Sequence, residues 1–403
     1  MRYAWRNLWR NRKRTAITLA AVAFNTAILI ATFSLIEGML KQSVGNVTNL
    51  VTGEAQVHAP GYLEDFSLYK TLSRPQAILE TALSHKVAAA PRCYGYGLIS
   101  SGPKSAGAFF RGVVPELERK TFDLANHLEE GSYLADKPER GLVLGKKLAR
   151  SLNVSVGSEV VVVVQAADGS LGNDLYTVTG ILKTTGESID RNAAFLHMAD
   201  FRELFVLGDR IHEIAFNTRG KFSLKKLVSV VKKVAPKEEI RNWRELLPMF
   251  SDMVNLSDVS IWIMGVIFFL AAALGVMNTM LMATYERIHE FGVMKALGVT
   301  PWRIIREVAA EALLLSLIAT GVGMFLGITG SYYLQIVGID TTRFVSGTTT
   351  MAGVAFDPVW RAALSLKAVV SPVVIMWIIC VLAALYPAMV AARLDPVEAM
   401  QHV

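Results

Sequence analysis

The chain has 403 residues, of which 52% are hydrophobic and 19% are charged, and its formal net charge is +7. A soluble domain usually carries about 25% charged residues. The low charge and the concentration of apolar residues in a few long blocks therefore indicate a membrane protein. The densest basic run, within residues 2–14, stands directly before the first apolar block, where basic residues orient a membrane helix. This placement argues against nucleic acid as the partner of the positive charge.

Residues 1–14 are predicted to form an amphipathic helix on the cytoplasmic side. Trp5, Leu8 and Trp9 follow one another at helical spacing, with basic residues on a neighbouring face. A helix of this kind lies in the headgroup layer of the membrane. A charged flank that merely orients the protein is the simpler interpretation, and it is compatible with the first.

Residues 15–36 are predicted as the first membrane span. At about 1.5 Å per residue this block extends roughly 33 Å, enough to cross a hydrocarbon core of about 30 Å. The alternative is a cleaved signal peptide, whose apolar region is usually about 7–15 residues long and ends in small residues. This block is longer, and its end at Ser34–Glu37 is a poor cleavage site. We therefore favour an anchored span.

Residues 37–258 are predicted to form a mixed α/β domain outside the cytoplasm. Two strand-like runs, 159–165 and 175–181, flank a stretch rich in turn residues and predict a hairpin. About 220 residues can bury a core, so this region is expected to be a folded domain. Further strands are expected at 106–114 and 211–216, and helices at 74–89, 142–152, 198–207 and 224–234.

Three further apolar blocks are predicted as membrane spans: 259–285, 309–337 and 369–392. The predicted fold class is an α-helical membrane protein with four transmembrane helices and a mixed α/β extracytoplasmic domain between helices 1 and 2.

Lys and Arg near the span ends set the orientation. The N-terminus, residues 286–308 and residues 393–403 are expected in the cytoplasm, whereas residues 338–368 form a short outer loop. The expected location is the inner membrane, with both termini cytoplasmic and the large domain periplasmic.

The most informative segment is 286–308, between the second and third spans. Its first half alternates charged and apolar residues at helical spacing. The charged residues expected on one face are Glu286, Arg287 and Glu290, and the apolar residues expected on another are Phe291, Met294 and Leu297. Gly298 can end this helix and Pro301 can open the next. Such a helix could be pushed by a partner protein, although an ordinary connector with solvated charges is the simpler interpretation.

Two pairs of residues within the spans are candidates for helix–helix interfaces. Gly323 and Gly327 have the small-xxx-small spacing that lets two helices approach closely. Asn25 and Asn278 are polar residues inside predicted spans, where they could hydrogen-bond across a dimer or line a lipid-facing cavity.

We find no catalytic, cofactor-binding or metal-binding constellation in the sequence. The seven histidines are scattered, with no H-E-x-x-H spacing. Gly145–Lys147 resembles a phosphate loop only superficially, because the Walker pattern G-x-x-x-x-G-K-[ST] is not met. Cys93 and Cys380 fall in different predicted environments, so no disulfide is expected between them. We expect a non-catalytic subunit that binds no cofactor itself.

Three runs together resemble the permease subunits of type VII ABC systems, the MacB/LolC/LolE/FtsX superfamily. They are AWRNLWRNRKRT at 4–15, ERIHEFGVMKALG at 286–298 and YPAMVAARLDPVEA at 386–399. The second is similar to the family signature E-R-x-x-E-I-G-x-x-x-A-L-G, and the third to the family ending P-A-x-x-A-x-x-x-x-P-x-E-A-L. Residues 143–157 resemble the MacB-like periplasmic core. In its length and its lack of a fused ATPase domain, the chain looks closest to the LolC/LolE-type permeases.

The resemblance implies that the short cytoplasmic helix docks in a cleft of a separate ABC ATPase dimer, which holds ATP and Mg. It assigns this contact to Glu286, Arg287, Glu290, Gly292, Lys295, Ala296, Leu297 and Gly298. It also implies a second permease subunit, identical or paralogous, beside this one among the membrane lipids. Closure of the ATPase dimer would then move the spans and the external domain, which is called mechanotransmission.

Extraction of lipoproteins or another amphiphile from the cytoplasmic membrane is the leading function that the resemblance implies, with a periplasmic lipoprotein carrier as a further partner. MacB-like efflux of small molecules or peptides from the periplasm is one alternative. FtsX-like regulation of a periplasmic hydrolase is another.

Overall fold

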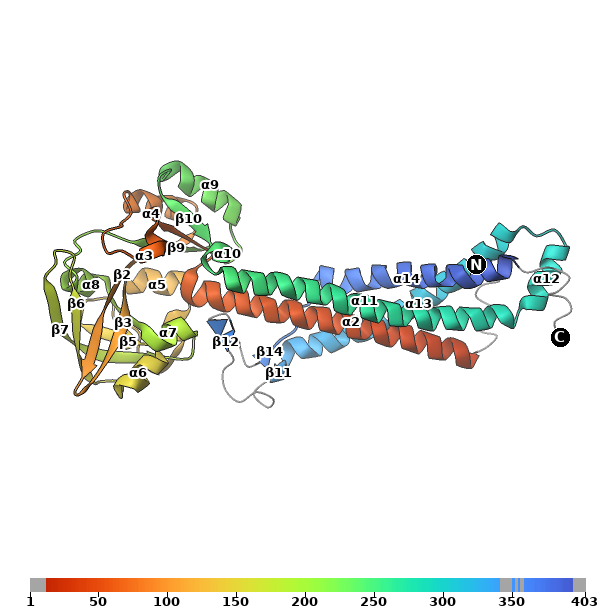
Figure 1. Cartoon of the computed structure of the whole chain (residues 1–403), viewed down its shortest axis with the longest axis horizontal. Helices are drawn as coiled ribbons and strands as arrows, with labels where there is room; N and C mark the ends of the chain where they lie inside the picture. The colour runs from red at the N-terminus through yellow and green to blue at the C-terminus, as the bar shows by residue number, and fades with distance from the viewer. Residues whose placement is uncertain (1–11, 341–349, 352–353, 356–358, 394–403) are drawn as a thin grey trace. The chain divides into compact units, whose positions relative to one another are not determined.

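A computed structural model describes residues 12–340, 350–351, 354–355 and 359–393. The predicted amphipathic N-terminal helix and the C-terminal tail lie largely outside these ranges, as does much of the predicted outer loop. The chain divides into two compact units. One is an α/β domain, mainly residues 42–253, and the other is a helical unit that includes residues 12–41, 254–340 and 359–393. Figure 1 labels the elements of both.

The α/β domain is built on one mixed sheet, which has ten strands among the described residues. Its order is β10-β1-β9-β2-β3-β8-β5-β7-β4, and β6 pairs with both β2 and β7. β3 pairs with β8, and β5 with β7, in parallel, while the other pairs are antiparallel. The strands are β1 (Ala55–His58), β2 (Ala88–Ser101), β3 (Lys104–Val113), β4 (Leu128–Gly131), β5 (Gly141–Leu144), β6 (Glu159–Gln165), β7 (Leu171–Leu182), β8 (Ala193–His197), β9 (Glu213–Asn217) and β10 (Glu239–Asn242).

Short helices pack around this sheet and complete its core. Leu148 and Phe201 from two of these helices join Phe110 and Val162 from the sheet in one apolar cluster. The helices are the π-helix η1 (Thr48–Thr52), α3 (Tyr62–Asp65), α4 (Pro75–Ser84), α5 (Pro115–Thr121), the 3-10 helix η2 (Leu124–Asn126), α6 (Lys146–Leu152), α7 (Glu187–Asn192), α8 (Met198–Leu204), α9 (Leu224–Val234) and α10 (Trp243–Leu246).

The predicted hairpin is confirmed by β6 and β7, which pair antiparallel with Val162 opposite Asp174. β6 contains a continuous run of valines, so both faces of this strand are apolar, yet only alternate residues are buried. Val160 and Val164 face the core, whereas Val161 is 37% exposed. A strand displays its residues on opposite faces in turn, so this run lies half in the core and half in solvent.

Two predicted helices are wrong in part. The segment predicted as a helix at 142–152 begins as β5, because Leu142–Leu144 are buried between β7 and β8 and hydrogen-bond to both. Only α6 is helical there. The helix predicted at 74–89 ends at Ser84, since Lys86 has a φ of +56° and the next residues enter β2. In both places a strand pairing overrides the helical spacing of the apolar residues.

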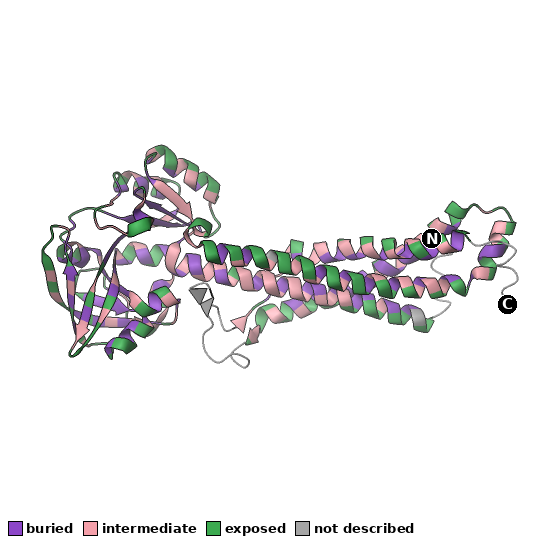
Figure 2. Ribbon diagram, in the orientation of Figure 1, coloured by how far each residue is buried: buried purple, intermediate pink, exposed green. Residues whose placement is uncertain are grey.

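The helical unit contains the helices predicted to span the membrane. Among the described residues, four helices are long and apolar enough to cross it by length and composition. They are α2 (Arg12–Val47), α11 (Pro248–Tyr285), α13 (Pro301–Ile336) and α14 (Leu366–Arg393). Several large apolar residues of α11 are exposed, among them Ile263, Ile267 and Leu270. Figure 2 colours much of this helix as exposed. An apolar exterior of this kind suits lipid rather than water, and the four-helix prediction is confirmed at this level.

Small residues bring α13 against α2 within the helical unit. A Cβ at Gly323 would lie 2.5 Å from the carbonyl oxygen of Ala23, and one at Gly327 would lie 2.9 Å from the Cβ of Ile30. Only hydrogen at these positions permits so close an approach. The two glycines therefore lie between two helices of the same chain.

The two asparagines of the spans differ in their surroundings. Asn25 has intermediate exposure and Asn278 is exposed on α11. A neighbouring residue makes the polar contact between helices: the Oγ1 of Thr18 in α2 donates a hydrogen bond of 2.9 Å to the Oγ1 of Thr279 in α11. The sequence did not single out this threonine pair, because each residue resembles an ordinary hydroxyl within a span.

Candidate functional site

The connector between α11 and α13 folds into the short helix α12 (Ile288–Ala296) with a sharp turn at each end. α11 ends at Tyr285, and Arg287 precedes α12 with a φ of −115° and a ψ of 12°, outside helical geometry. After α12, Gly298 takes a φ of +87°, which glycine adopts without strain. Pro301 then stands in the first turn of α13. The predicted roles of Gly298 and Pro301 are confirmed.

A buried ion pair fastens the start of α12 to α13. The Nη1 of Arg287 donates a hydrogen bond of 2.8 Å to the Oε1 of Glu311, and the side chains are 9% and 7% exposed. The Nε of Arg287 also contacts the Oε2 of Glu290 at 3.1 Å. A buried charge pair needs such geometry, because removing either partner leaves an uncompensated charge.

Two further contacts fasten the middle and the end of α12. Phe291 is fully buried in a cluster that includes Ile304 of α13 and Ala388 of α14. The Nζ of Lys295 donates a hydrogen bond of 2.9 Å to the carbonyl oxygen of Ala392 in α14. The short helix is thus held by two neighbouring helices, so a force on α12 would reach α13 and α14.

The opposite face of α12 is open and carries both charged and apolar side chains. Glu290 and Ala296 are exposed on α12, and Glu286 and Gly298 are exposed just before and just after it. The exposed large apolar residues of the connector are Tyr285 (55%), Val293 (37%), Leu297 (80%) and Trp302 (71%). Below, the docking face means these eight residues. Exposed large apolar groups beside acidic ones are typical of a surface that meets another protein.

Three predicted positions differ from the sequence analysis. Arg287 was expected on the charged outer face but is turned inward, because it lies in the break between α11 and α12 and not within a continuous helix. Gly292 is also buried. Leu297 was expected to pack with Phe291 but is 80% exposed, since α12 ends at Ala296. Of the eight residues assigned to the contact, Arg287 and Gly292 are thus buried and Lys295 bonds to α14, whereas the other five are exposed. Their contact with an ATPase stays a prediction.

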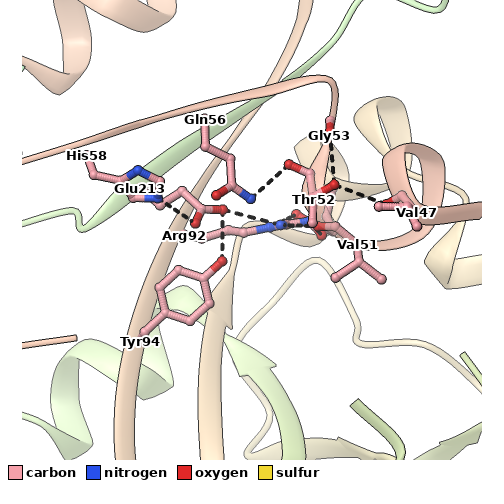
Figure 3. A network of polar contacts seen from close by, with 10 residues as sticks. Val47, Val51, Thr52, Gly53, Gln56, His58, Arg92, Tyr94 and Glu213 are labelled. Atoms are coloured by element: carbon pink, nitrogen blue, oxygen red, sulfur yellow. Dashed lines mark hydrogen bonds and ion pairs between the residues drawn. The ribbon is translucent and has the colours of Figure 1, made fainter. Parts of the chain in front are cut away.

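A second group of polar residues lies inside the α/β domain and was missed by the sequence analysis (Figure 3). At its centre Arg92 of β2 is 1% exposed. Its Nη2 donates to the Oε1 of Glu118 at 2.5 Å, and its Nη1 lies 3.3 Å from the Oε1 of Glu213. The same Nη1 donates a hydrogen bond of 2.6 Å to the carbonyl oxygen of Val51 in η1. Arg92 thereby joins η1 and α5 to the sheet.

Glu213 is held by three donors at once. The Oη of Tyr94 donates to it at 2.8 Å, and the Nε2 of His58 lies 3.1 Å from its Oε2, in addition to the contact with Arg92. Burial raises the pKa of Glu213, but the hydrogen bond from His58 and nearby charges outweigh this, so its pKa lies below the ordinary value. The carboxylate is therefore ionised and structurally engaged, which leaves it no free role as an acid or base.

His212 closes the same polar group with a defined tautomer. Its Nδ1 accepts a hydrogen bond of 2.9 Å from the backbone N–H of Tyr94, so its Nε2 donates to the carbonyl oxygen of Leu68 at 3.0 Å. Burial lowers the pKa of His212, and a neutral ring fits both contacts. Tyr62 stacks on this ring, with the centroids 5.4 Å apart. The arrangement is one of mutual support and offers no nucleophile.

Neither cysteines nor acidic clusters provide a metal site in the described ranges. No group of three or more His, Cys, Asp or Glu side chains there could hold a metal ion. Cys93 and Cys380 are both free and buried. The Sγ of Cys93 donates to the carbonyl oxygen of Arg210 at 3.4 Å, and burial raises its pKa to about 12. Such a thiol packs as a small apolar group.

Two protein families match this chain. Residues 15–234 match the family described as MacB-like periplasmic core domain, and residues 262–396 match the family described as FtsX-like permease C-terminal. The first match covers more than half of the chain. Together the two matches include most of the α/β domain, most of α11, and α12, α13 and α14.

Individual proteins are similar over nearly the whole chain. The lipoprotein-releasing system transmembrane protein LolC of Neisseria meningitidis is 22% identical, over 96% of this chain and 94% of the relative. The pyoverdine export ATP-binding/permease protein PvdT of Pseudomonas putida is 25% identical, over 98% of this chain but 58% of the relative. Among solved structures, the periplasmic region of MacB from Actinobacillus actinomycetemcomitans is 14% identical, with a TM-score of 0.35, over 50% of this chain and 93% of that one.

Proposed function

Because the chain belongs to the permease family that carries the MacB-like periplasmic core domain, we propose that it transmits the motion of an ATPase to an external domain. The chain is an ABC transporter permease of the LolC, LolE and MacB type, as the sequence resemblance indicated. Its relatives are permease components of ABC systems, which implies an ATPase partner. The proposal adds that this ATPase is a separate subunit, that it holds ATP and Mg, and that it docks on α12.

The observation that carries the proposal is the combination of an open docking face with a fastened inner face on α12. Leu297 stands 80% exposed at the end of the helix, while Phe291 is fully buried on the other side. The contacts of Arg287 and Lys295 reach α13 and α14 respectively. When a partner displaces a helix that is open on one side and fixed on the other, the displacement is transmitted to the helices to which it is fixed.

Orientation follows from the basic residues of the connector and of the chain start. Lys295, Arg303 and Arg306 lie between the second and third spans, and the densest basic run precedes the first. Because basic residues gather on the cytoplasmic side of a membrane, we place both termini and α12 in the cytoplasm. The α/β domain is then periplasmic, on the side from which a cargo is taken.

The cargo that the helical unit fits is an amphiphile, and a lipoprotein is the leading candidate. A pocket of about 640 Å³ lies among α2, α11 and α14, with walls that include Phe33, Trp262 and Phe269. Glu37 and Lys367 also line it. Pockets of about 300–1,000 Å³ with apolar walls and a few polar groups are typical ligand sites. Here the walls suit an acyl chain and the charged pair suits a polar head.

Two partners complete the proposal. A second permease subunit, identical or paralogous, stands beside this chain in the inner membrane, and a periplasmic carrier receives the lipoprotein. Similarity to LolC supports this arrangement, while similarity to the pyoverdine exporter PvdT supports efflux from the periplasm as the alternative function.

The test of ATPase docking is a Leu297→Asp variant of the full chain, purified in detergent from its own host. We expect an ABC ATPase to co-purify with the wild type and its recovery to fall at least tenfold with the variant, because the substitution replaces the most exposed large apolar side chain of the docking face with a charge. Mass spectrometry identifies the ATPase, and ATP hydrolysis quantifies it.

Leu83→Asp is the matched control, since Leu83 is 77% exposed in the α/β domain and Leu297 is 80% exposed. The control should keep the ATPase. Equal recovery of ATPase with both variants, or none with the wild type, would overturn the docking proposal. A co-purified lipoprotein supports release from the membrane, and an outer-membrane duct supports efflux instead. A hydrolase would point to the FtsX-like regulatory role.

A further inference from the structure

The α/β domain contains a second pocket, of about 510 Å³, that no part of the proposed function uses. Strands β2 and β3 supply Tyr94, Tyr96, Phe109 and Arg111 to its lining. Polar residues of α7 and of the segment before it line the pocket as well, among them Ser188 and Thr185. The pocket thus combines aromatic rings, hydroxyl groups and two arginines, Arg92 and Arg111, in a single concave space.

Arg111 differs from its neighbour Arg92 in having no charged partner. Among the described residues, none pairs with Arg111 through a carboxylate or accepts a hydrogen bond from it, and its Nε is buried without a partner. The three nearest rings surround its guanidinium, with centroids 5.8 Å away at Tyr94, 5.7 Å at Phe109 and 5.3 Å at Phe195. The guanidinium is held by ring faces and left without an anion.

One carboxylate in the lining of this pocket already has other partners. Glu213 lines the same pocket, yet its oxygens are occupied by His58, Tyr94 and Arg92. Burial lowers the pKa of Arg111, and the charge of Arg92 acts in the same direction. An arginine nevertheless stays protonated in proteins, so the pocket lining holds a half-buried positive charge with which an anion could pair.

The remaining walls define what else the ligand must contain. Phe66 and Leu247 are apolar parts of the lining. Tyr96 is 59% exposed, so part of the lining is open to solvent. Apolar walls around one oriented cation are the ordinary composition of a site for a small amphiphile, and a guanidinium binds carboxylate or phosphate in a bidentate manner.

We propose that this pocket binds an anionic amphiphile, with its carboxylate or phosphate on Arg111 and its apolar part against the aromatic wall. The site lies wholly within the α/β domain and is distinct from the pocket of the helical unit. The inference does not depend on ATPase docking, because binding can be measured without nucleotide and without any partner.

The test uses the full chain in lipid nanodiscs and four probes: octanoate, octyl phosphate, octanol and inorganic phosphate. Titration calorimetry is corrected with empty nanodiscs, which removes partition into lipid. We expect one saturable site per chain for octanoate or octyl phosphate, and at least tenfold weaker binding of octanol. The stronger of the two anions identifies a carboxylate or a phosphate as the native group. Inorganic phosphate should bind weakly, since it lacks the apolar part.

Variants separate an anion site from a purely structural arginine. Arg111→Met should weaken binding of the anionic probe at least tenfold, so that the anion no longer binds more tightly than octanol. Arg111→Lys should retain part of the affinity. Arg150→Met is the matched control, because Arg150 is exposed on α6 of the same domain. It should bind like the wild type.

Tyr96→Ala keeps the test decisive if Arg111→Met fails to fold. Because Tyr96 is exposed, removing its ring should leave the domain folded. The variant should bind octanoate and octyl phosphate several-fold more weakly. The proposal is overturned if neither anion binds above the empty nanodisc, if octanol binds as tightly as the anions, or if a folded Arg111→Met variant binds like the wild type.

Discussion

The α/β domain and the helical unit each bury an ion-paired arginine, and they surround it differently. Arg92 meets two carboxylates, those of Glu118 and Glu213, and lies 4.0 Å from the ring centroid of Phe122. Arg287 meets one buried carboxylate, that of Glu311, and one from the half-open Glu290. The first arginine is enclosed in a sheet, whereas the second lies at the junction between two helices.

The difference indicates that the buried arginine has a different structural role in each unit. In the α/β domain the contacts of Arg92 join segments that are far apart in the sequence, so the charge specifies one tertiary arrangement. In the helical unit Arg287 fixes α12 to its neighbour α13. Removing the cation should therefore lower the free energy of unfolding more in the α/β domain, where two carboxylates would remain buried without it.

The largest effect is expected for Arg92→Met. Breaking a buried pair costs about 3–5 kcal/mol. This variant removes the cation from two buried carboxylates, those of Glu118 and Glu213, which places it at the upper end. Proteolysis across a urea titration measures the stability of the α/β domain. Arg191→Met is the control, because Arg191 is 73% exposed and an ion pair as exposed as the one with Glu187 contributes little to stability. Equal losses in the two variants would show that the Arg92 network is not a source of stability.

A smaller loss, about 3 kcal/mol, is expected for Arg287→Met, because this substitution removes the buried cation that contacts Glu311. The double variant Arg287→Met with Glu311→Leu should regain most of this loss, because both charges are then absent. Loss of helicity during a titration with a denaturing detergent provides the measurement. If the double variant is no more stable than the single one, then the buried charge of Glu311 is not the cause.

The smallest of the three effects tests the packing between α13 and α2. Gly323→Ala places a Cβ 2.5 Å from a backbone oxygen of Ala23, so the helices must separate, and overpacking typically costs about 1–3 kcal/mol. Gly321→Ala is a matched control on the same helix, since a Cβ there meets nothing within 4 Å. The same detergent titration compares them. A loss as large for Gly321→Ala would show that contact with α2 is not the cause, because helix propensity by itself favours alanine over glycine.

Features set by neighbouring residues were predictable from the sequence. The hairpin of β6 and β7 and the helix α9 follow from local spacing, and the end of α12 follows from Gly298. The apolar helices were predictable for the same reason, because length and hydropathy are properties of a continuous segment.

Features that depend on distant residues were not predictable. His58 and Glu213 are 155 positions apart, and no spacing rule connects them. Arg287 has the pattern of an exposed charge until its partner Glu311, 24 positions away, is placed beside it. The strand β5 was mistaken for a helix since its neighbours in the sheet come from later in the chain.

The sequence by itself determined the class of protein, the family resemblance and the place of the short connecting helix, because these depend on composition, continuous apolar length and local motifs. Only the tertiary structure decided which charges are engaged. Arg92, Arg111 and Arg287 are the same residue type in a list of residues, yet one is paired twice, one is left to aromatic rings and one fastens a helix. The physical reason is that the energy of a charge depends on which groups replace its water, and those groups come from elsewhere in the chain.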